Sequence, residues 1–191
     1  MAMAAQHREP PVNTAWCVIT GPPSAGKTTL IEALAARGHR VVPETARAHI
    51  AELGVTPAEI AADAALQARI QHGIAARQHR IEQALDPQEP LFLDRALPDS
   101  IAYFEQLALE TGHLVAGARR RYRRVFYLEG LALQADGLRF EDAGAAQALG
   151  EAILGAYRRL GYVPERVPTC LENDVARAVA ARLSIVLSRD P

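Results

Sequence analysis

The stretch "GPPSAGKTTL", residues 21–30, decides the fold class. Gly21 and Gly26 are separated by four residues and followed by Lys27 and Thr28, which is the spacing of a phosphate-binding loop. Glycine lets the backbone curl so that successive N–H groups point into one concavity. The two prolines of the stretch carry no N–H, so we expect the amides from Ser24 to Thr28 to hold a triphosphate.

The sequence on either side of the loop supports this interpretation over a chance glycine-rich turn. Residues 15–20 form a continuous apolar run, which is typical of a parallel strand covered on both faces. After the loop, Leu30, Ile31 and Leu34 fall on one side of a predicted helix. The predicted nucleotide-binding residues are Gly21, Ser24, Ala25, Gly26, Lys27, Thr28 and Thr29.

The composition singles out Lys27. Of the 21 lysine and arginine residues, 20 are arginine, and the one lysine lies inside the loop. A lysine ammonium is a compact point charge, whereas a guanidinium is a planar fork. The position therefore favours a role at the β and γ phosphates of ATP, while the Thr28 hydroxyl would ligate Mg²⁺.

The chain as a whole has the size and balance of one globular domain. It has 191 residues, of which 49% are hydrophobic, and a formal net charge of −1. We expect a flexible tail over residues 1–13 and a single nucleotide-binding domain over residues 14–191. The charge predicts no general attraction to nucleic acid or anionic membranes. No secretion signal or membrane-spanning run of ~18–20 apolar residues is evident, which favours the cytoplasm.

The cysteines, histidines and arginine run suggest no further site. Cys17 and Cys170 are too few for a disulfide framework and are interpreted as small buried hydrophobes. The six histidines show no metal-ligand spacing, so no zinc site is predicted. The run "RRRYRR", residues 119–124, suggests a nucleic-acid patch, but the net charge favours a solvated helix end, with a role in contacting phosphate as the second alternative.

Predicted strands and helices alternate along the chain. The predicted strands are residues 15–20, 40–44, 90–94, 124–131 and 162–168, and residues 132–144 are expected to be irregular. The predicted helices are residues 28–38, 45–53, 57–85, 98–110, 145–161 and 172–187. Such alternation predicts an α/β fold, with a parallel sheet between two layers of helices.

Several classes of protein carry a phosphate-binding loop. A switch GTPase needs an Asn-Lys-x-Asp motif. The single lysine of this chain, Lys27, lies in the phosphate-binding loop, so the chain cannot contain that motif. An assembled ATPase motor needs a longer chain with a helical lid domain. A small-molecule kinase needs an acid for Mg²⁺, a carboxylate near the acceptor hydroxyl, and a lid arginine.

The sequence offers one candidate for each of these kinase groups. Asp94 ends the apolar strand "PLFLD" and would organise Mg²⁺, with Arg95 facing the phosphates or the acceptor; an ordinary helix cap is the alternative for Asp94. Glu44 follows the second strand and could orient or deprotonate an acceptor hydroxyl, or simply favour a helix N-terminus. Arg47 could bind an anion or be a solvated charge. Arg139 follows an Asp-Gly turn, where a lid or a plain surface loop would lie.

These motifs, in this order, resemble those of the NadR-like AAA-domain family of P-loop ATPases. The segments are "ITGPPSAGKTTLIEALAARGHRVVPETAR", "FLDRALPDSIAYFE" and "ADGLRFED", and the resemblance covers roughly residues 15 to 185. The chain is similar to the ribosylnicotinamide kinase domain of NadR proteins. It contains nothing that resembles an adenylyltransferase domain, so the resemblance does not imply a full NadR role.

The resemblance implies a P-loop NTPase fold with five parallel strands in the order 2-3-1-4-5, and ATP with Mg²⁺ as ligand. By motif, the loop binds the triphosphate, Asp94 organises Mg²⁺, Glu44 faces the acceptor and Arg139 lies in the lid. The leading hypothesis is a kinase that acts on an unidentified, nucleoside-like small molecule. The alternative is an ATP-hydrolysing or ATP-sensing protein that acts through a protein partner.

Overall fold

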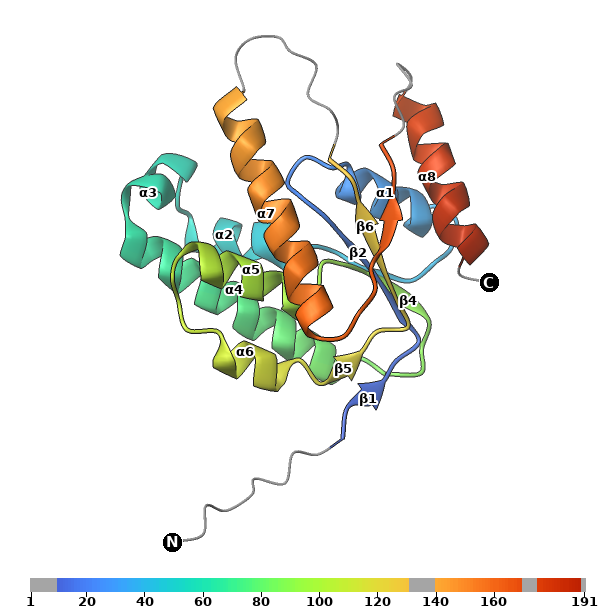
Figure 1. Cartoon of the computed structure of the whole chain (residues 1–191), viewed down its shortest axis with the longest axis horizontal. Helices are drawn as coiled ribbons and strands as arrows, with labels where there is room; N and C mark the ends of the chain where they lie inside the picture. Colours follow the sequence, from blue (N-terminus) through green and yellow to red (C-terminus); the bar gives the residue numbers. More distant parts are fainter. Residues whose placement is uncertain (1–9, 131–139, 170–174, 190–191) are drawn as a thin grey trace, which may run out of the picture.

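The centre of the fold is a parallel five-stranded sheet, which lies between two groups of helices in Figure 1. The computed structural model describes residues 10–130, 140–169 and 175–189. The strands are β2 (Trp16–Thr20), β3 (Val41–Val42), β4 (Leu91–Asp94), β6 (Arg124–Leu128) and β7 (Glu165–Val167). Their spatial order is β3-β4-β2-β6-β7, which is the predicted order 2-3-1-4-5 when these five are counted along the chain.

The register of the strands aligns their carboxyl ends. Ile19 of β2 lies opposite Asp94 of β4 on one side and opposite Phe126 of β6 on the other. The segments that follow these strands therefore meet at one edge of the sheet. Ligands of open α/β folds bind at this edge.

The helices cover both faces of the sheet, as predicted. α1 (Lys27–Ala35) and α8 (Val175–Arg189) pack on one face, and α5 (Leu97–Gln106) and α7 (Phe140–Arg159) pack on the other (Figure 1). Alternate residues of β2 point to opposite faces. Cys17 and Ile19 join the core beneath α1 and α8, whereas Trp16 and Val18 join the core beneath α5 and α7.

A further set of helices lies outside α5. It consists of α2 (Thr45–Leu53), α3 (Pro57–Ala62), α4 (Ala64–Ala84) and α6 (Gly112–Gly117). The prediction of one helix over residues 57–85 is wrong, because Asp63 is extended, at φ −128° and ψ 104°. Its carboxylate accepts hydrogen bonds from the amides of Ala65 and Leu66 and so begins a second helix.

Other predicted boundaries also differ from those of the structure, and the strands and helices are mostly shorter than expected. The helix expected over residues 98–110 ends at Gln106, and α6 follows it. The irregular segment expected over 132–144 is helical from Phe140 onward. The prediction of a flexible tail over residues 1–13 falls mostly outside the described chain, which begins at residue 10; at its end, β1 (Val12–Asn13) pairs in parallel with β5 (Arg120–Arg121).

The interpretation of the arginine run as a solvated helix end is also wrong. The Arg120 Nε donates to the carbonyl of Glu82 at 3.1 Å, near the end of α4. Arg121 donates to the carbonyl of Leu160, just beyond α7, and its guanidinium carbon lies 5.4 Å from the centre of the Tyr162 ring. Helices end in unpaired carbonyls at the negative end of the dipole, so these arginines cap two helices.

A substitution of Arg121 tests this capping role. Arg121→Met leaves the Leu160 carbonyl without its charged donor, and we expect the free energy of unfolding to fall by about 1–2 kcal/mol. Urea denaturation measures the change. The control is Arg158→Met, which removes an exposed cation from the same end of α7 and should cost about 0.5 kcal/mol or less. Equal losses in the two variants would contradict the assignment.

Membrane crossing finds no support in the helices. Among the helices that the structure describes, none is both long enough and apolar enough to cross a lipid bilayer.

Candidate active site

The phosphate-binding loop leaves β2 through a glycine that no other residue can replace. Gly21 has φ +141°, and a Cβ there would lie 2.3 Å from the carbonyl oxygen of Leu128. Ser24 and Gly26 also have positive φ, at 60° and 78°, so the loop curls before α1 begins at Lys27. The predicted loop therefore has the curled backbone that an anion cradle requires.

Lys27 is buried at the start of α1 and folds back over its own loop. Its Nζ donates to the carbonyls of Pro22 at 2.6 Å and Gly21 at 3.2 Å. Burial, followed by the nearby Arg95 charge, lowers the pKa of Lys27 to about 8. Thr28 is partly exposed beside it, and Ser24 and Thr29 are exposed.

Asp94 is the last residue of β4 and lies at the same edge of the sheet. Its Oδ1 is buried and accepts no hydrogen bond from any residue that the structure describes. Burial, together with the Glu44 carboxylate, raises the pKa of Asp94 to about 6. Asp94 does not cap α5, because the amide of Ala96 donates to Asp99 Oδ2 at 3.1 Å instead. A buried carboxylate oxygen without a donor fits a hard cation such as Mg²⁺.

Arg95 connects three parts of the site. Its guanidinium donates to Glu44 Oε1 and to Asp99 Oδ1, both at 2.9 Å, and to the carbonyl of Gly21 at 3.2 Å. Burial alone would lower the pKa of this guanidinium, but the Asp99 and Glu44 carboxylates outweigh burial and hold it above its ordinary value. Arg95 therefore stays charged and ties the phosphate loop to the end of β3.

Asp99 is a further site residue, which the sequence motifs did not assign to the site. Besides Arg95 and the amide of Ala96, it accepts hydrogen bonds from the hydroxyls of Thr20 and Tyr157, each at 2.6 Å. A carboxylate with four donors is fixed in place, so it holds Arg95 in one orientation. No pattern in the sequence indicates that these four donors converge.

Glu44 points at Arg95 rather than at the helix that follows it. It occupies the N-cap position of α2 without making a capping hydrogen bond. Its second carboxylate oxygen lies 3.5 Å from the Nε of the exposed Arg47. The carboxylate thus lies between two arginines, in addition to its place at the start of α2.

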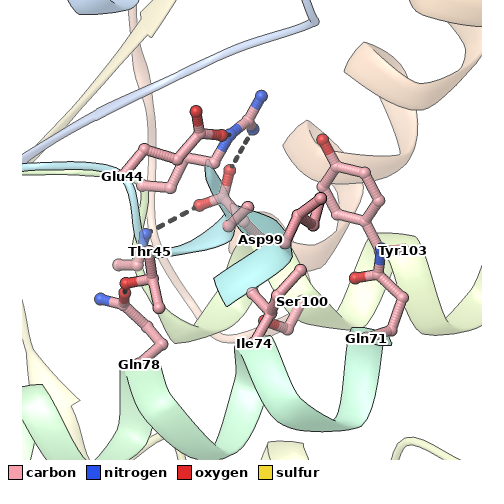
Figure 2. A pocket seen from close by; sticks show the side chains of 12 residues that line it. Glu44, Thr45, Gln71, Ile74, Gln78, Asp99, Ser100 and Tyr103 are labelled. Carbon is pink, nitrogen blue, oxygen red and sulfur yellow. Dashed lines mark hydrogen bonds and ion pairs between the residues drawn. The ribbon is translucent and has the colours of Figure 1, made fainter. Parts of the chain in front are cut away.

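A cavity of about 200 Å³ opens beside Glu44 and Arg95. Figure 2 shows α2, α4 and α5 contributing its walls. Its lining residues are Glu44, Thr45, Ala46, Ile50, Gln71, Ile74, Gln78, Arg95, Ala96, Asp99, Ser100 and Tyr103. Apart from Glu44 and Arg95, the sequence analysis assigned none of these residues to a binding site. Residues that recur at helical spacing can line a cavity or simply pack against a neighbouring helix, and the sequence does not distinguish the two.

A chain of side-chain hydrogen bonds runs through one wall of this cavity. The Thr45 hydroxyl donates to Gln78 Oε1 at 2.6 Å, and Gln78 Nε2 donates to Glu82 Oε1 at 3.0 Å. The same Glu82 oxygen accepts from the amide of Leu97, and its other oxygen accepts from the Tyr122 hydroxyl. Burial raises the pKa of Glu82.

The structure brings together the phosphate loop, Glu44, Asp94 and Arg95. Arg139, the predicted lid residue, lies outside the described residues, as does Cys170. Cys17 is buried in the sheet, as predicted.

Comparison with a protein-family model places the chain in a family. The model described as AAA domain matches residues 16–174, so the chain belongs to this AAA-domain family. The family predicted from the motifs is thereby confirmed. No curated protein sequence matches the chain.

Solved structures of kinases share the fold. A NadR protein in complex with NR has a TM-score of 0.58 at 17% identity, over 88% of this chain and 49% of NadR. This chain thus spans about half the length of NadR. Thymidylate kinase from Ehrlichia chaffeensis has a TM-score of 0.57 at 13% identity, over 94% of this chain and 100% of the kinase. Deoxyadenosine kinase from M. mycoides matches with the same TM-score and identity, over 91% of this chain and 97% of the kinase.

The lowered pKa of Lys27 generates a prediction about pH. Phosphates favour the charged ammonium, so ATP binding should take up a proton near and above pH 8, and affinity should fall as the pH rises through about 8. Calorimetry at pH 8.5 in two buffers of different ionisation enthalpy measures the uptake. In Lys27→Arg, whose guanidinium stays charged, any remaining binding should lose this uptake. Binding by the parent protein without proton uptake would contradict the role of Lys27.

Proposed function

We propose that this AAA-domain protein is an ATP- and Mg²⁺-dependent kinase that phosphorylates a hydroxyl of a small molecule. The observation that supports the proposal most is the position of Arg95. Its guanidinium binds the first carbonyl of the phosphate loop and the carboxylate of Glu44, which lies on the rim of the cavity. A phosphate donor in the loop and an acceptor in the cavity would therefore meet beside Glu44.

The charge of the cavity favours a neutral acceptor. Among the lining residues, Arg95 is the only cation, and it is already bound by the two carboxylates Glu44 and Asp99. A phosphorylated acceptor would face excess negative charge, whereas an uncharged hydroxyl compound would not. Tyr103 and Ile74 add an aromatic and an aliphatic surface, which suits the base of a nucleoside. A nucleoside-like acceptor also agrees with the fold shared with nucleoside and nucleotide kinases.

The proposed reaction is a direct transfer. The acceptor hydroxyl oxygen forms a bond to the γ-phosphorus of ATP, while the bond from that phosphorus to the β–γ bridging oxygen breaks. The hydroxyl proton passes to Glu44 or, through it, to solvent. The products are ADP and a phosphate ester. Arg95 holds the Glu44 carboxylate in place, and Lys27 would stabilise charge on the phosphates.

Asp94 and Thr28 are the residues that would hold Mg²⁺. The donor-free oxygen of Asp94 and the hydroxyl of Thr28 are hard ligands of the kind this cation prefers. The bound ion would neutralise part of the charge of the β and γ phosphates.

A coupled assay of acceptors tests the function. Purified protein is incubated with Mg²⁺ and γ-labelled ATP, with a panel of nucleosides, the corresponding nucleoside monophosphates, or no addition. We expect label transfer to a nucleoside or another neutral hydroxyl compound and little ADP without it. ADP release that needs no acceptor and rises with a protein partner would favour the alternative, an ATP-hydrolysing or ATP-sensing protein.

Asp94→Asn tests the metal role. The amide keeps the shape of the side chain but removes the charge, so Mg²⁺-dependent turnover should fall about 10²–10³-fold while the protein stays folded. The exposed Asp86, which precedes the same strand, provides the control variant Asp86→Asn with unchanged turnover. Full activity of a folded Asp94→Asn protein would remove the metal assignment.

Glu44→Gln tests the acceptor role. The substitution lies one strand away from the phosphate loop, so ATP affinity should change less than about threefold while transfer falls by about 10²-fold or more. Calorimetry with ATP and the transfer assay give the two numbers. Glu52→Gln, on the exposed side of the same helix, should leave both unchanged. Loss of ATP binding with intact transfer would show that Glu44 serves the nucleotide and not the acceptor.

A further inference from the structure

One buried cation near the C-terminus has no part in the proposed chemistry. Arg182, on α8, is only 5% exposed, although α8 otherwise packs on the sheet through apolar residues. Its guanidinium donates to the carbonyls of Ala25 at 2.5 Å, Glu129 at 2.9 Å and Pro168 at 3.2 Å. A planar guanidinium with several fixed donors suits such a set of carbonyls, whereas an ammonium can reach fewer of them.

These three carbonyls belong to segments at the ligand-binding edge of the sheet. Ala25 lies in the phosphate loop, Glu129 follows β6 and Pro168 follows β7. Arg182 therefore fastens the phosphate loop to the ends of two strands. The anchor comes from a helix that follows the loop by more than a hundred residues.

The contact at Ala25 determines how the next amide points. The peptide bond between Ala25 and Gly26 is trans and planar, so its C=O and N–H groups point in opposite directions. With the carbonyl held toward α8, the N–H of Gly26 is turned away from α8. A Cβ at Gly26 would lie 3.2 Å from Arg182 Nη1, so the guanidinium lies close against this peptide.

We propose that Arg182 is a positioning residue of the phosphate loop, which holds the Ala25–Gly26 peptide with its N–H directed at the phosphates of the nucleotide. The inference rests on the proposed binding of ATP in this loop. A fixed donor costs no reorganisation when the ligand arrives, which is the basis of preorganised anion binding. Loss of Arg182 should weaken the binding of nucleotides that carry a β-phosphate, since the loop cradles that part of the phosphate chain.

The test compares affinities for ATP, ADP and AMP by calorimetry. In Arg182→Met we expect the dissociation constants of ATP and ADP to rise together by about tenfold or more, and that of AMP to change less than about twofold. Arg182→Lys, which keeps a donor for the Ala25 carbonyl, should recover part of the loss. Arg189→Met, on the exposed side of α8 and paired with Glu165, should bind all three nucleotides as the parent does.

The outcomes separate this inference from the proposed function. Arg182 variants that melt earlier but bind ATP and ADP as the parent does would overturn the positioning role and leave ATP binding intact. Equal loss of AMP, ADP and ATP would also overturn it, because the effect would not be specific to the loop. A parent protein that binds neither ATP nor ADP would overturn the proposed function and this inference with it. If Arg182→Met does not fold, Arg182→Gln, whose amide keeps one donor, undergoes the same titrations.

Discussion

The hydrogen bonds of one guanidinium organise the whole candidate site. Arg95 is placed just past β4 with a left-handed backbone, at φ 68°, and its amide still donates to Ile19 of the neighbouring strand. From there its side chain binds Glu44, Asp99 and the first carbonyl of the phosphate loop. Because a buried charge is costly unless it is paired, each of these contacts stabilises the arrangement of the others. The position of Glu44 is thus a consequence of the same pairing that fixes the loop.

The local elements could be predicted from the sequence, because each depends on nearby residues. The phosphate loop follows from the glycine spacing and the strand before it, and the strand order came with the family resemblance. Asp94 and Arg95 could be chosen because they end an apolar run at the edge where parallel strands finish. The break at Asp63 is not evident from the sequence, because an aspartate within a helical pattern is usually a solvent-exposed charge. Its capping hydrogen bonds to the amides of Ala65 and Leu66 appear only in the structure.

Contacts between distant segments could not be predicted in this way. Asp99 receives donors from Thr20 and Tyr157, which are far away in sequence, and nothing local marks it as their common acceptor. Arg182 reads as an ordinary charge of an amphipathic helix, yet it is buried against three carbonyls. Arginines 120 and 121 read as a basic patch, but tertiary packing directs them to the ends of two helices.

The wall of the cavity that contains Gln78 has a fixed polarity. The Leu97 amide can only donate, so Glu82 Oε1 is an acceptor whether or not Glu82 carries a proton on its other oxygen. As long as Oε1 carries no proton, Gln78 faces Glu82 with its nitrogen and Thr45 with its oxygen, because a flipped amide would set two acceptors against each other. The Thr45 hydroxyl donates its single proton to Gln78, so only its lone pairs remain to accept a hydrogen bond from a ligand. A ligand that forms a hydrogen bond with Thr45 in this cavity would therefore have to supply the donor itself.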